Sequence, residues 1–462
     1  MWCGTIFLSH VLFGGNLNGE APRYRMDEAD KPFICRLAPF ADGFELEFLA
    51  KGAENQVLYR KRGESEWVSV KAEGGCMRIE HLEQNTDYEC KVAENDAAES
   101  KIRLVRTGAV PEGAVVINYL HPEDSAYSFS GRYLCSPSLA RLEDGTIVAG
   151  MDLFGTAMGQ NLTLLFRSTD NGKTWRYLTD LYPFYWGSLF CHRGRLYILG
   201  LSTEYGNLQI AASDDGGKQW SAPVTIFYGS SKLCDNGGMH RAPMQMVPFE
   251  GRLYTTCEYG SWDMGSHLPA VLSIDENADL LVQENWSCTG FLPFEGKWRE
   301  EAQTQGDTME GNIILAPDKT MYNYLRWDTG KALKLKVDAE HPDAPLEFHS
   351  IVTMPVTNSM FRLFSQDGIY YLISNIKEDG QKCDCWSCRN VLAVFRSEDL
   401  ENWERVRNIV NRKDDDPQLV GFQYPAYLFD ENGLSVSVRS AFNNAHSFHD
   451  SNYILYFNLG AI

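Results

Sequence analysis

Several residues of this sequence have side chains that can transfer protons near neutral pH: His240, Glu310, Tyr424, His449 and Asp450. Imidazole, carboxyl and phenol groups are the usual general acids and bases of enzymes. His240 stands beside Arg241, whose charge should disfavour the imidazolium form and leave a neutral base near pH 7. Glu310 begins an expected strand and Tyr424 precedes Pro425, so both could face a substrate. The alternatives are a histidine that caps a loop and a tyrosine that belongs to a core.

One turn, residues 443–450, contains His446, His449 and Asp450 together with two asparagines. A carboxylate in such a turn can orient His449 and select its tautomer. His446 is then a candidate substrate contact. The alternative is a polar turn that only joins two strands. Two histidines three residues apart are weak evidence for a metal site.

Two aromatic segments are candidates for binding a sugar. Arg326 lies in 322–327, where an arginine among aromatic rings could clamp a carboxylate or a sugar, or could form only a surface cation–π pair. Trp186 ends the segment 182–186 and could stack on a sugar ring or fill a core. The chain has 11 Trp, 22 Tyr and 24 Phe, a composition that favours β-structure and suits carbohydrate binding.

Repeated turns indicate which elements position these residues. The pattern Ser-x-Asp-x-Gly-x-x-Trp occurs at 168–175 and 213–220, and a degenerate copy occurs at 397–403. The Asp can accept backbone N–H bonds, the Gly can take positive φ, and the Trp can fill the space between strands. Each copy follows a strand-like run, at 162–167, 208–212 and 391–396. A repeated hairpin predicts an all-β propeller, in which Asp170 and Asp215 are structural.

This pattern resembles the Asp-box, or BNR repeat, of the sialidase-like superfamily. We expect an N-terminal segment at 1–30, a small domain at 31–108 and a sialidase-like β-propeller at 109–462. Leu82 and Tyr88 fit a tyrosine corner, and 31–108 resembles a fibronectin type III sandwich. Four-stranded blades of about 50 residues predict seven blades, with six longer blades as the alternative. The strand at 453–457 should pair near the propeller's start and close the ring.

A sialidase would use three arginines for the substrate carboxylate, an aspartate acid/base and a tyrosine–glutamate nucleophile. By this resemblance, Cys135 in the segment 133–139 stands where the first arginine is expected. A thiol cannot make the charged bidentate grip of a guanidinium. The sequence therefore argues against ordinary sialidase activity, and an atypical exo-sialidase is kept as an alternative.

Other segments resemble propeller enzymes that release L-rhamnose from glucuronic acid, by hydrolysis or by β-elimination. They are 136–138, 240–243, 310–312, 421–424 and 444–453. This resemblance implies substrate contacts for Arg241 and Asp152. Members of that group often have a histidine directly before the aspartate at the end of the first-blade strand. Met151 occupies that position here and cannot replace a histidine in proton transfer.

The resemblance implies a carbohydrate-active enzyme that cleaves a terminal glycosidic bond in uronic-acid-containing oligosaccharides. In β-elimination, His240 would be the base, Arg326 would neutralise the carboxylate and Tyr424 would protonate the leaving oxygen. In hydrolysis, Glu310 and Asp450 would flank the bond. The alternative from another class is a glycan-binding propeller without catalysis.

Bulk properties limit the partners and the compartment. A chain of 462 residues should hold two domains, and a net charge of -20 argues against nucleic acids and anionic membranes as partners. The expected partner is an oligosaccharide with anionic groups, and the oligomeric state is open. The N-terminus lacks the basic region of a signal peptide, so the 12 cysteines are expected to be reduced thiols in the cytoplasm.

No cofactor is firmly expected, and two divalent metals are considered. Cys383, Cys385 and Cys388 place three thiols within six residues and could bind zinc if a fourth ligand comes from elsewhere. The alternative is a loop of free thiols. Calcium at the propeller axis is the second possibility.

Overall fold

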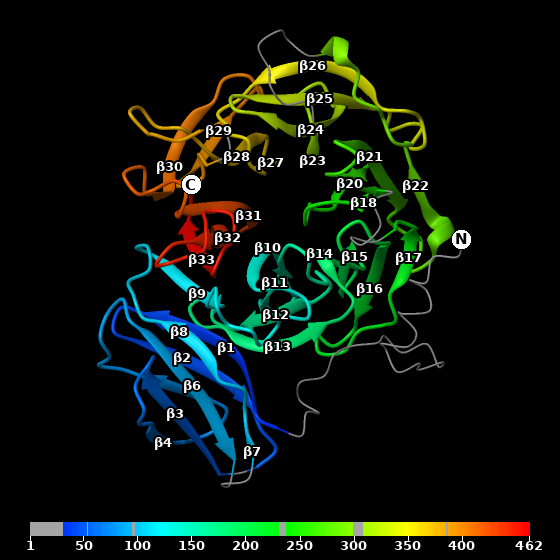
Figure 1. Ribbon diagram of the computed structural model, residues 1–462. Helices are drawn as coiled ribbons and strands as arrows, with labels where there is room; N and C mark the ends of the chain where they lie inside the picture. The colour runs from blue at the N-terminus through cyan, green and yellow to red at the C-terminus, as the bar shows by residue number, and fades with distance from the viewer. Residues whose placement is uncertain (1–30, 53, 95–97, 231–236, 299–307, 385–386) are drawn as a thin grey trace.

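The structure is a computed structural model that describes residues 31–462 except 53, 95–97, 231–236, 299–307 and 385–386 (Figure 1). The expected N-terminal segment at 1–30 lies outside the described residues. Strands make up nearly all of the regular structure, and two short 3-10 turns are η2 (Gln283–Asn285) and η3 (Gly296–Trp298). In the described part of the chain, no helix has the length and apolarity needed to cross a membrane.

Two small sheets form the N-terminal part. One consists of β1 (Phe33–Phe40), β2 (Gly43–Leu49) and β5 (Cys76–Ile79). The other consists of β3 (Asn55–Lys61), β4 (Val68–Ala72), β6 (Asp87–Glu94), β7 (Ala98–Glu99) and β8 (Arg103–Arg106). Apolar side chains at alternate positions, such as Leu46, Val57 and Val92, are fully buried between them. The period of two is that of strands with one buried face.

The Tyr88 hydroxyl accepts the N–H of Glu83 at 3.0 Å, so the backward bond expected of a tyrosine corner is confirmed. The same part of the chain packs on the larger body. Arg36 on β1 donates to the carbonyl of Ile117 at 2.8 Å, and Glu47 accepts the N–H of Tyr177 at 2.9 Å. The two small sheets lie outside the ring of sheets, beside β9 (Ala114–Tyr119) and β13 (Arg176–Leu181) (Figure 1).

Six sheets are arranged around a common centre (Figure 1). The first contains β10 (Tyr133–Arg141), β11 (Ile147–Phe154), β12 (Thr163–Ser168) and β13. The second contains β14 (Tyr185–His192), β15 (Arg195–Leu201), β16 (Leu208–Ser213) and β17 (Val224–Phe227). The third contains β18 (Gly238–His240), β19 (Val247–Phe249), β20 (Arg252–Ser261), β21 (Ser266–Asp275) and β22 (Trp286–Cys288).

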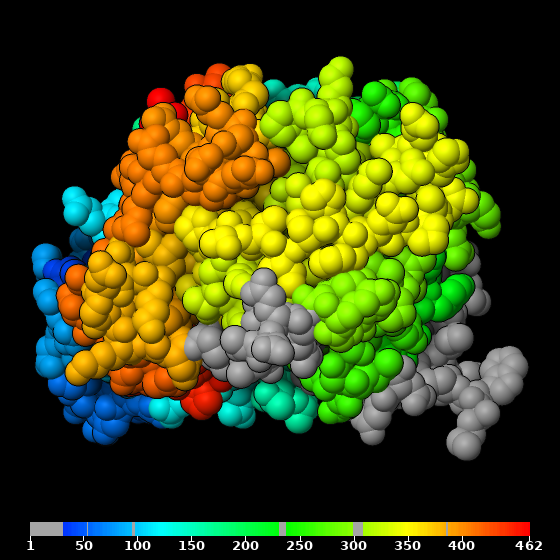
Figure 2. Space-filling model, turned by 90° about the horizontal axis from the view of Figure 1, so that it is seen from above, coloured from blue at the N-terminus to red at the C-terminus, as the bar shows by residue number. Residues whose placement is uncertain are grey.

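The remaining sheets complete the ring, and the outer strands of the fourth and fifth cover one side of it (Figure 2). The fourth sheet contains β23 (Met309–Leu315), β24 (Met321–Asp328), β25 (Lys331–Val337) and β26 (Glu347–Thr353). The fifth contains β27 (Arg362–Gln366), β28 (Ile369–Asn375), β29 (Val391–Ser397) and β30 (Glu404–Asn411). The sixth contains β31 (Gly421–Asp430), β32 (Gly433–Ala441), β33 (Tyr453–Gly460) and β9.

The division into seven blades is wrong for the residues that the structure describes, which form six sheets in the ring. The estimate of about 50 residues per blade failed because long connections, such as 276–308, separate the sheets. Closure of the ring is confirmed: β33 pairs with β9, the first strand after the small domain, with Tyr453 opposite Tyr119. The last strand therefore joins the two ends of the ring.

The repeated turns have the expected chemistry. Asp170 accepts the N–H of Thr174 at 2.9 Å, and the indole N–H of fully buried Trp175 donates to the carbonyl of Gly172 at 3.2 Å. Asp215 accepts two backbone N–H groups at 2.9 Å in the second copy. Both aspartates stabilise turns, as predicted.

Replacing Asp170 with alanine should lower the free energy of unfolding by about 1–3 kcal/mol, because the turn loses charge-assisted hydrogen bonds. Urea denaturation of both proteins measures this difference. The control is Asp328→Ala, at a half-buried strand end where the carboxylate accepts the N–H of Thr329. An equal effect of the two substitutions would contradict the special role of Asp170.

The cysteine cluster does not have the expected form. Cys383 and Cys388 form a disulfide, so their sulfurs are not available as zinc ligands, and Cys385 lies outside the described residues. The expectation of reduced thiols is wrong for this pair. Among the cysteines that the structure describes, seven others are free, and the cytoplasmic location stays a prediction.

Candidate active site

Four of the inner strands contain a bulge near their starts. In β10, β14, β23 and β31 the pairing register shifts beside a residue with positive φ: Ser136 at 45°, Trp186 at 52°, Glu310 at 59° and Tyr424 at 53°. A bulge re-aims a side chain relative to strict alternation. Non-glycine residues rarely hold such a conformation unless their surroundings stabilise it, and such strain clusters at functional sites. Four inner strands of the ring thus each carry a strained bulge residue near the start of the strand.

Glu310 and Tyr424 meet across the ring. The Tyr424 hydroxyl donates to Oε1 of Glu310 at 2.7 Å, while Nη1 of Arg326 contacts Oε2 of Glu310 at 2.7 Å and the Tyr424 oxygen at 3.2 Å. All three residues are buried. Burial alone would raise the pKa of Glu310, but Arg326 and the hydrogen bond from Tyr424 hold that pKa below its usual value. The carboxylate is therefore ionised and can accept the phenolic proton.

Two further arginines surround Tyr424, and the sequence analysis missed both. The Arg439 guanidinium carbon lies 5.2 Å from the centre of the Tyr424 ring, and Arg439 donates to the carbonyl of His449. Arg389 donates to Gln423 and, at 3.0 Å, to the carbonyl of Asn358. Within the described ranges, no acidic side chain pairs with either guanidinium. Burial, together with the neighbouring guanidinium groups, lowers the pKa of Arg389 to about 10.

His240 is linked to Glu310 through Glu258, a residue that the sequence analysis also missed. Nδ1 of His240 lies 3.0 Å from one carboxylate oxygen of Glu258, and the other oxygen accepts the N–H of Glu310 at 2.8 Å. Glu258 thus supports the left-handed backbone of Glu310. Burial opposes the imidazolium form, but the hydrogen bond and charge of Glu258 raise the pKa of His240 above its ordinary value.

The expectation that Arg241 makes His240 a neutral base is therefore wrong. Successive side chains of a strand point to opposite faces, so the sequence neighbour is not the spatial neighbour. Arg241 is fully buried and donates to the carbonyls of Leu199 and Met244 and to Thr255. It joins strands, and its predicted substrate contact stays a prediction.

Replacing Glu258 with glutamine should lower the pKa of His240, because the imidazolium loses its charged partner while remaining buried. A rate that needs protonated His240 should then lose its alkaline limb about 1 pH unit earlier than in the wild type. The pH dependence of kcat/KM, together with an NMR titration of the histidine, checks this shift. An unchanged alkaline limb would refute the link, and Glu404→Gln, at an exposed ion pair, is the control.

The turn before β33 forms a separate group. Asp450 accepts from Nδ1 of His446 at 2.7 Å and lies 3.1 Å from Nδ1 of His449. Burial and Arg439 lower the pKa of His449 to about 4, despite Asp450. The imidazole is neutral at pH 7, and Asp450 orients it as expected. Asp450 is hydrogen-bonded to these histidines, and its pairing with Glu310 across a scissile bond stays a prediction.

Two predicted binding residues have limited access. Asp152 is 1% exposed, hydrogen-bonds Thr163, and has a pKa raised well above its usual value by burial. Its predicted contact with a substrate stays a prediction. Trp186 is 9% exposed and stacks on Tyr185 with ring centres 4.7 Å apart. Its edge faces His240 at 4.6 Å, so it forms part of the wall beside that histidine.

In the first sheet, Cys135 and Met151 stand where the resemblances lead one to expect an arginine and a histidine. Cys135 and Met151 are fully buried, and Cys135 lies 3.9 Å from the hydroxyl of Tyr185. Burial raises the pKa of Cys135 to about 12, so the thiol is neutral. The described residues contain no group of three histidine, cysteine, aspartate or glutamate side chains that could hold a metal ion. The expected zinc and calcium sites thus gain no support.

Comparisons with known proteins agree with this architecture. The solved structure of the Hadza microbial sialidase Hz136 has a TM-score of 0.50 at 12% identity, covering 94% of this chain and 95% of that chain. An alpha-L-arabinanase of Penicillium chrysogenum has a TM-score of 0.48 at 12% identity, covering 74% of this chain and 97% of that chain. At 12% identity, the likeness to the Hz136 structure concerns the fold alone.

A family model agrees with the fold. No curated protein matches the chain in sequence. Residues 197–438 match the family model described as a BNR repeat-like domain, which is more than half of the chain. The chain therefore belongs to the BNR repeat-like domain family.

Proposed function

We propose that the chain is a carbohydrate-active enzyme that cleaves a terminal glycosidic bond of an oligosaccharide in which one of the two sugars joined by that bond carries a carboxylate. The carrying observation is the hydrogen bond from Tyr424 to Glu310 beside two guanidinium groups, those of Arg389 and Arg439, for which no acidic partner is described. A phenol beside an ionised carboxylate can act as a nucleophile or a proton carrier. A substrate carboxylate would supply the missing counter-charge.

Hydrolysis is the route that this geometry supports best. Tyr424 would attack the anomeric carbon while its proton passes to Glu310, and water would later release the sugar, as a tyrosine nucleophile allows. Arg326 keeps Glu310 ionised before the attack. His240, with its raised pKa, is the candidate proton donor to the leaving oxygen. A uronic-acid oligosaccharide of the rhamnosyl-glucuronate type is the first substrate to test.

β-Elimination is the second candidate, favoured by the two arginines. When the proton next to a carboxylate is removed, negative charge builds up on that carboxylate and must be neutralised. The two guanidinium groups of Arg389 and Arg439 can do this together. Glu310 would take the phenolic proton of Tyr424, the phenolate would remove the proton next to the carboxylate, and protonated His240 would give its proton to the leaving oxygen. A glycan-binding propeller without turnover remains the contrasting function.

A substrate panel distinguishes these routes. Purified protein is incubated with rhamnosyl-glucuronate oligosaccharides, their carboxyl-reduced counterparts and an aryl sialoside, and products are identified by mass spectrometry. A gain in ultraviolet absorbance of an unsaturated uronate indicates elimination, whereas a water-sized mass gain indicates hydrolysis. We expect turnover only where the carboxylate is intact. Equal turnover of carboxyl-reduced substrate, or binding without any product, would refute the proposal.

The N-terminal part supports a second, architectural proposal. The two sheets of β1–β8 and the Tyr88 bond suit a fibronectin type III-like domain at 31–108. Its contacts with Ile117 and Tyr177 suggest that it supports the propeller and takes no part in catalysis.

A further inference from the structure

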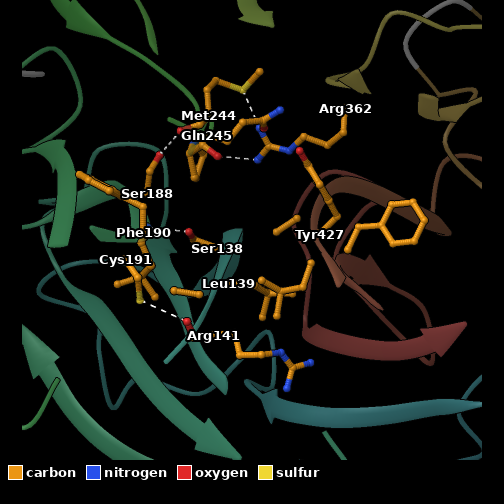
Figure 3. Close-up of a pocket in the computed structure, with 16 residues that line it drawn as sticks. Ser138, Leu139, Arg141, Ser188, Phe190, Cys191, Met244, Gln245, Arg362 and Tyr427 are labelled. Atoms are coloured by element: carbon orange, nitrogen blue, oxygen red, sulfur yellow. Dashed lines mark hydrogen bonds between the residues drawn. The ribbon is translucent and has the colours of Figure 1, made fainter. Parts of the chain in front are cut away.

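A cavity of about 240 Å³ lies farther along the same inner strands that carry the candidate active site (Figure 3). Its walls come from 138–141 and 426–429, which follow the bulge residues Ser136 and Tyr424 in their strands, and from 188–191 and 243–245. The cavity and the candidate active site therefore lie at different positions along the length of the same inner strands. The proposed reaction does not use this cavity.

The cavity has cationic walls. Two arginines, Arg141 and Arg362, line it, and no carboxylate is among the residues that line it. Arg141 is paired with Asp430. Arg362 is 2% exposed, and its partners among the described residues are the carbonyls of Pro243 and Pro425 and the sulfur of Met244. A thioether is a weak acceptor, so one N–H of Arg362 is poorly satisfied.

A second positive charge lies close behind the same wall. Arg241 is fully buried and donates to the carbonyl of Met244, and its Nε has no hydrogen-bond partner. Burial lowers the pKa of Arg241 and of Arg362 to about 10, although the charge of Glu258 opposes this at Arg241 and that of Glu310 opposes it at Arg362. Among the described residues, neither guanidinium forms a direct ion pair with a carboxylate. A buried charge without a counter-charge is unfavourable, and proteins usually pair it. A bound anion would remove this imbalance, whereas a divalent cation would increase it.

We propose that this cavity binds a small monovalent anion such as chloride, held by Arg362 with help from Ser138 and Gln245. The guanidinium of Arg362 points across the cavity toward Met244 and Gln245 (Figure 3). Oγ of Ser138 accepts the N–H of Leu189 at 2.8 Å, which leaves its own hydrogen to donate. Gln245 donates weakly to Leu363 at 3.4 Å and has a second amide hydrogen. The anion would fix the inner strands around Met244, independently of the proposed catalysis.

Thermal unfolding in matched salts tests this site. Sodium gluconate, whose anion is too large and hydrated for the cavity, is replaced by sodium chloride at constant ionic strength. Chloride should raise Tm by about 1–2 °C, as expected when the ligand exceeds its dissociation constant about tenfold in a chain of this length. Arg362→Met should lose the increase, while Arg195→Gln, at an exposed pair with Asp214, should retain it. Equal Tm values of the wild type in both salts would overturn the proposal.

A second measurement does not depend on whether the Arg362 variant folds. Crystals of the wild-type protein are soaked in bromide, and the anomalous signal locates the halide. We expect one strong peak in the cavity within hydrogen-bonding distance of the Arg362 guanidinium. Peaks confined to the protein surface, with the cavity empty, would also overturn the proposal.

Discussion

Replacing Tyr424 with phenylalanine should reduce kcat by about 10²–10⁴-fold and leave the protein folded. The substitution keeps the ring that packs beside Arg439 and removes only the hydroxyl that donates to Glu310. If the phenol attacks or moves a proton, no other group at this position can replace it. Steady-state kinetics on the preferred substrate measures the loss, and circular dichroism with thermal unfolding checks the fold.

The control for this experiment is Tyr371→Phe. Tyr371 is also largely buried in the ring of sheets, and its ring stacks on Phe364 at 5.6 Å. Its variant should keep wild-type kcat. If Tyr424→Phe retains more than about a tenth of the wild-type kcat, a decrease far smaller than general catalysis by a phenol implies, then Tyr424 only shapes the site. Substrate affinity, measured separately, distinguishes this outcome from a loss of binding.

Local chemistry could be predicted from the sequence where it involves few neighbouring residues. The turn at Asp170 is determined within eight residues by hydrogen-bonding side chains and a glycine, so its role was predicted correctly. The Tyr88 bond spans five residues and was predicted for the same reason. Pairing of β33 with β9 followed from the general need of a ring to close.

The candidate site was predicted only in part because long-range pairing determines its chemistry. Glu310, Arg326 and Tyr424 were identified, but their contact depends on bulges that no simple alternation reveals. Arg389 and Arg439 lie in or beside apolar strands and resemble ordinary sheet residues in the sequence. The signal that could have identified Arg439 is its place in β32, a strand of buried residues without a neighbouring acid.

The error about His240 shows which neighbour determines a pKa. Arg241 adjoins it in the sequence, but Glu258 lies opposite it on β20, eighteen residues away. Directly opposed residues of antiparallel strands interact at close range, while adjacent residues of one strand do not share a face. Predicting the charge of a histidine in such a fold therefore needs the strand register first.

Replacing Arg326 with methionine should destabilise the protein by about 3–5 kcal/mol at neutral pH, because it leaves Glu310 as a buried carboxylate without its partner. The side chains of this pair are only 5% and 3% exposed, so water cannot compensate for the loss. Urea unfolding measures the difference. Because unpaired Glu310 should have a raised pKa, the deficit should shrink as the pH falls and the carboxyl becomes protonated.

In the wild type, the contribution of Glu310 to stability depends on pH in the opposite sense. There the pKa of Glu310 is lowered in the folded state, so its contribution is present above the pKa of the unfolded chain and is lost as the pH falls through the folded value. A double variant isolates the interaction energy between Arg326 and Glu310. Adding Glu310→Gln to Arg326→Met removes the buried charge, so the double variant should be more stable than the sum of the single effects predicts, by about 0.5–3 kcal/mol. Strict additivity would mean that Arg326 stabilises the ring through packing alone, and Tyr424 would then lack the ionised acceptor that its proton transfer requires.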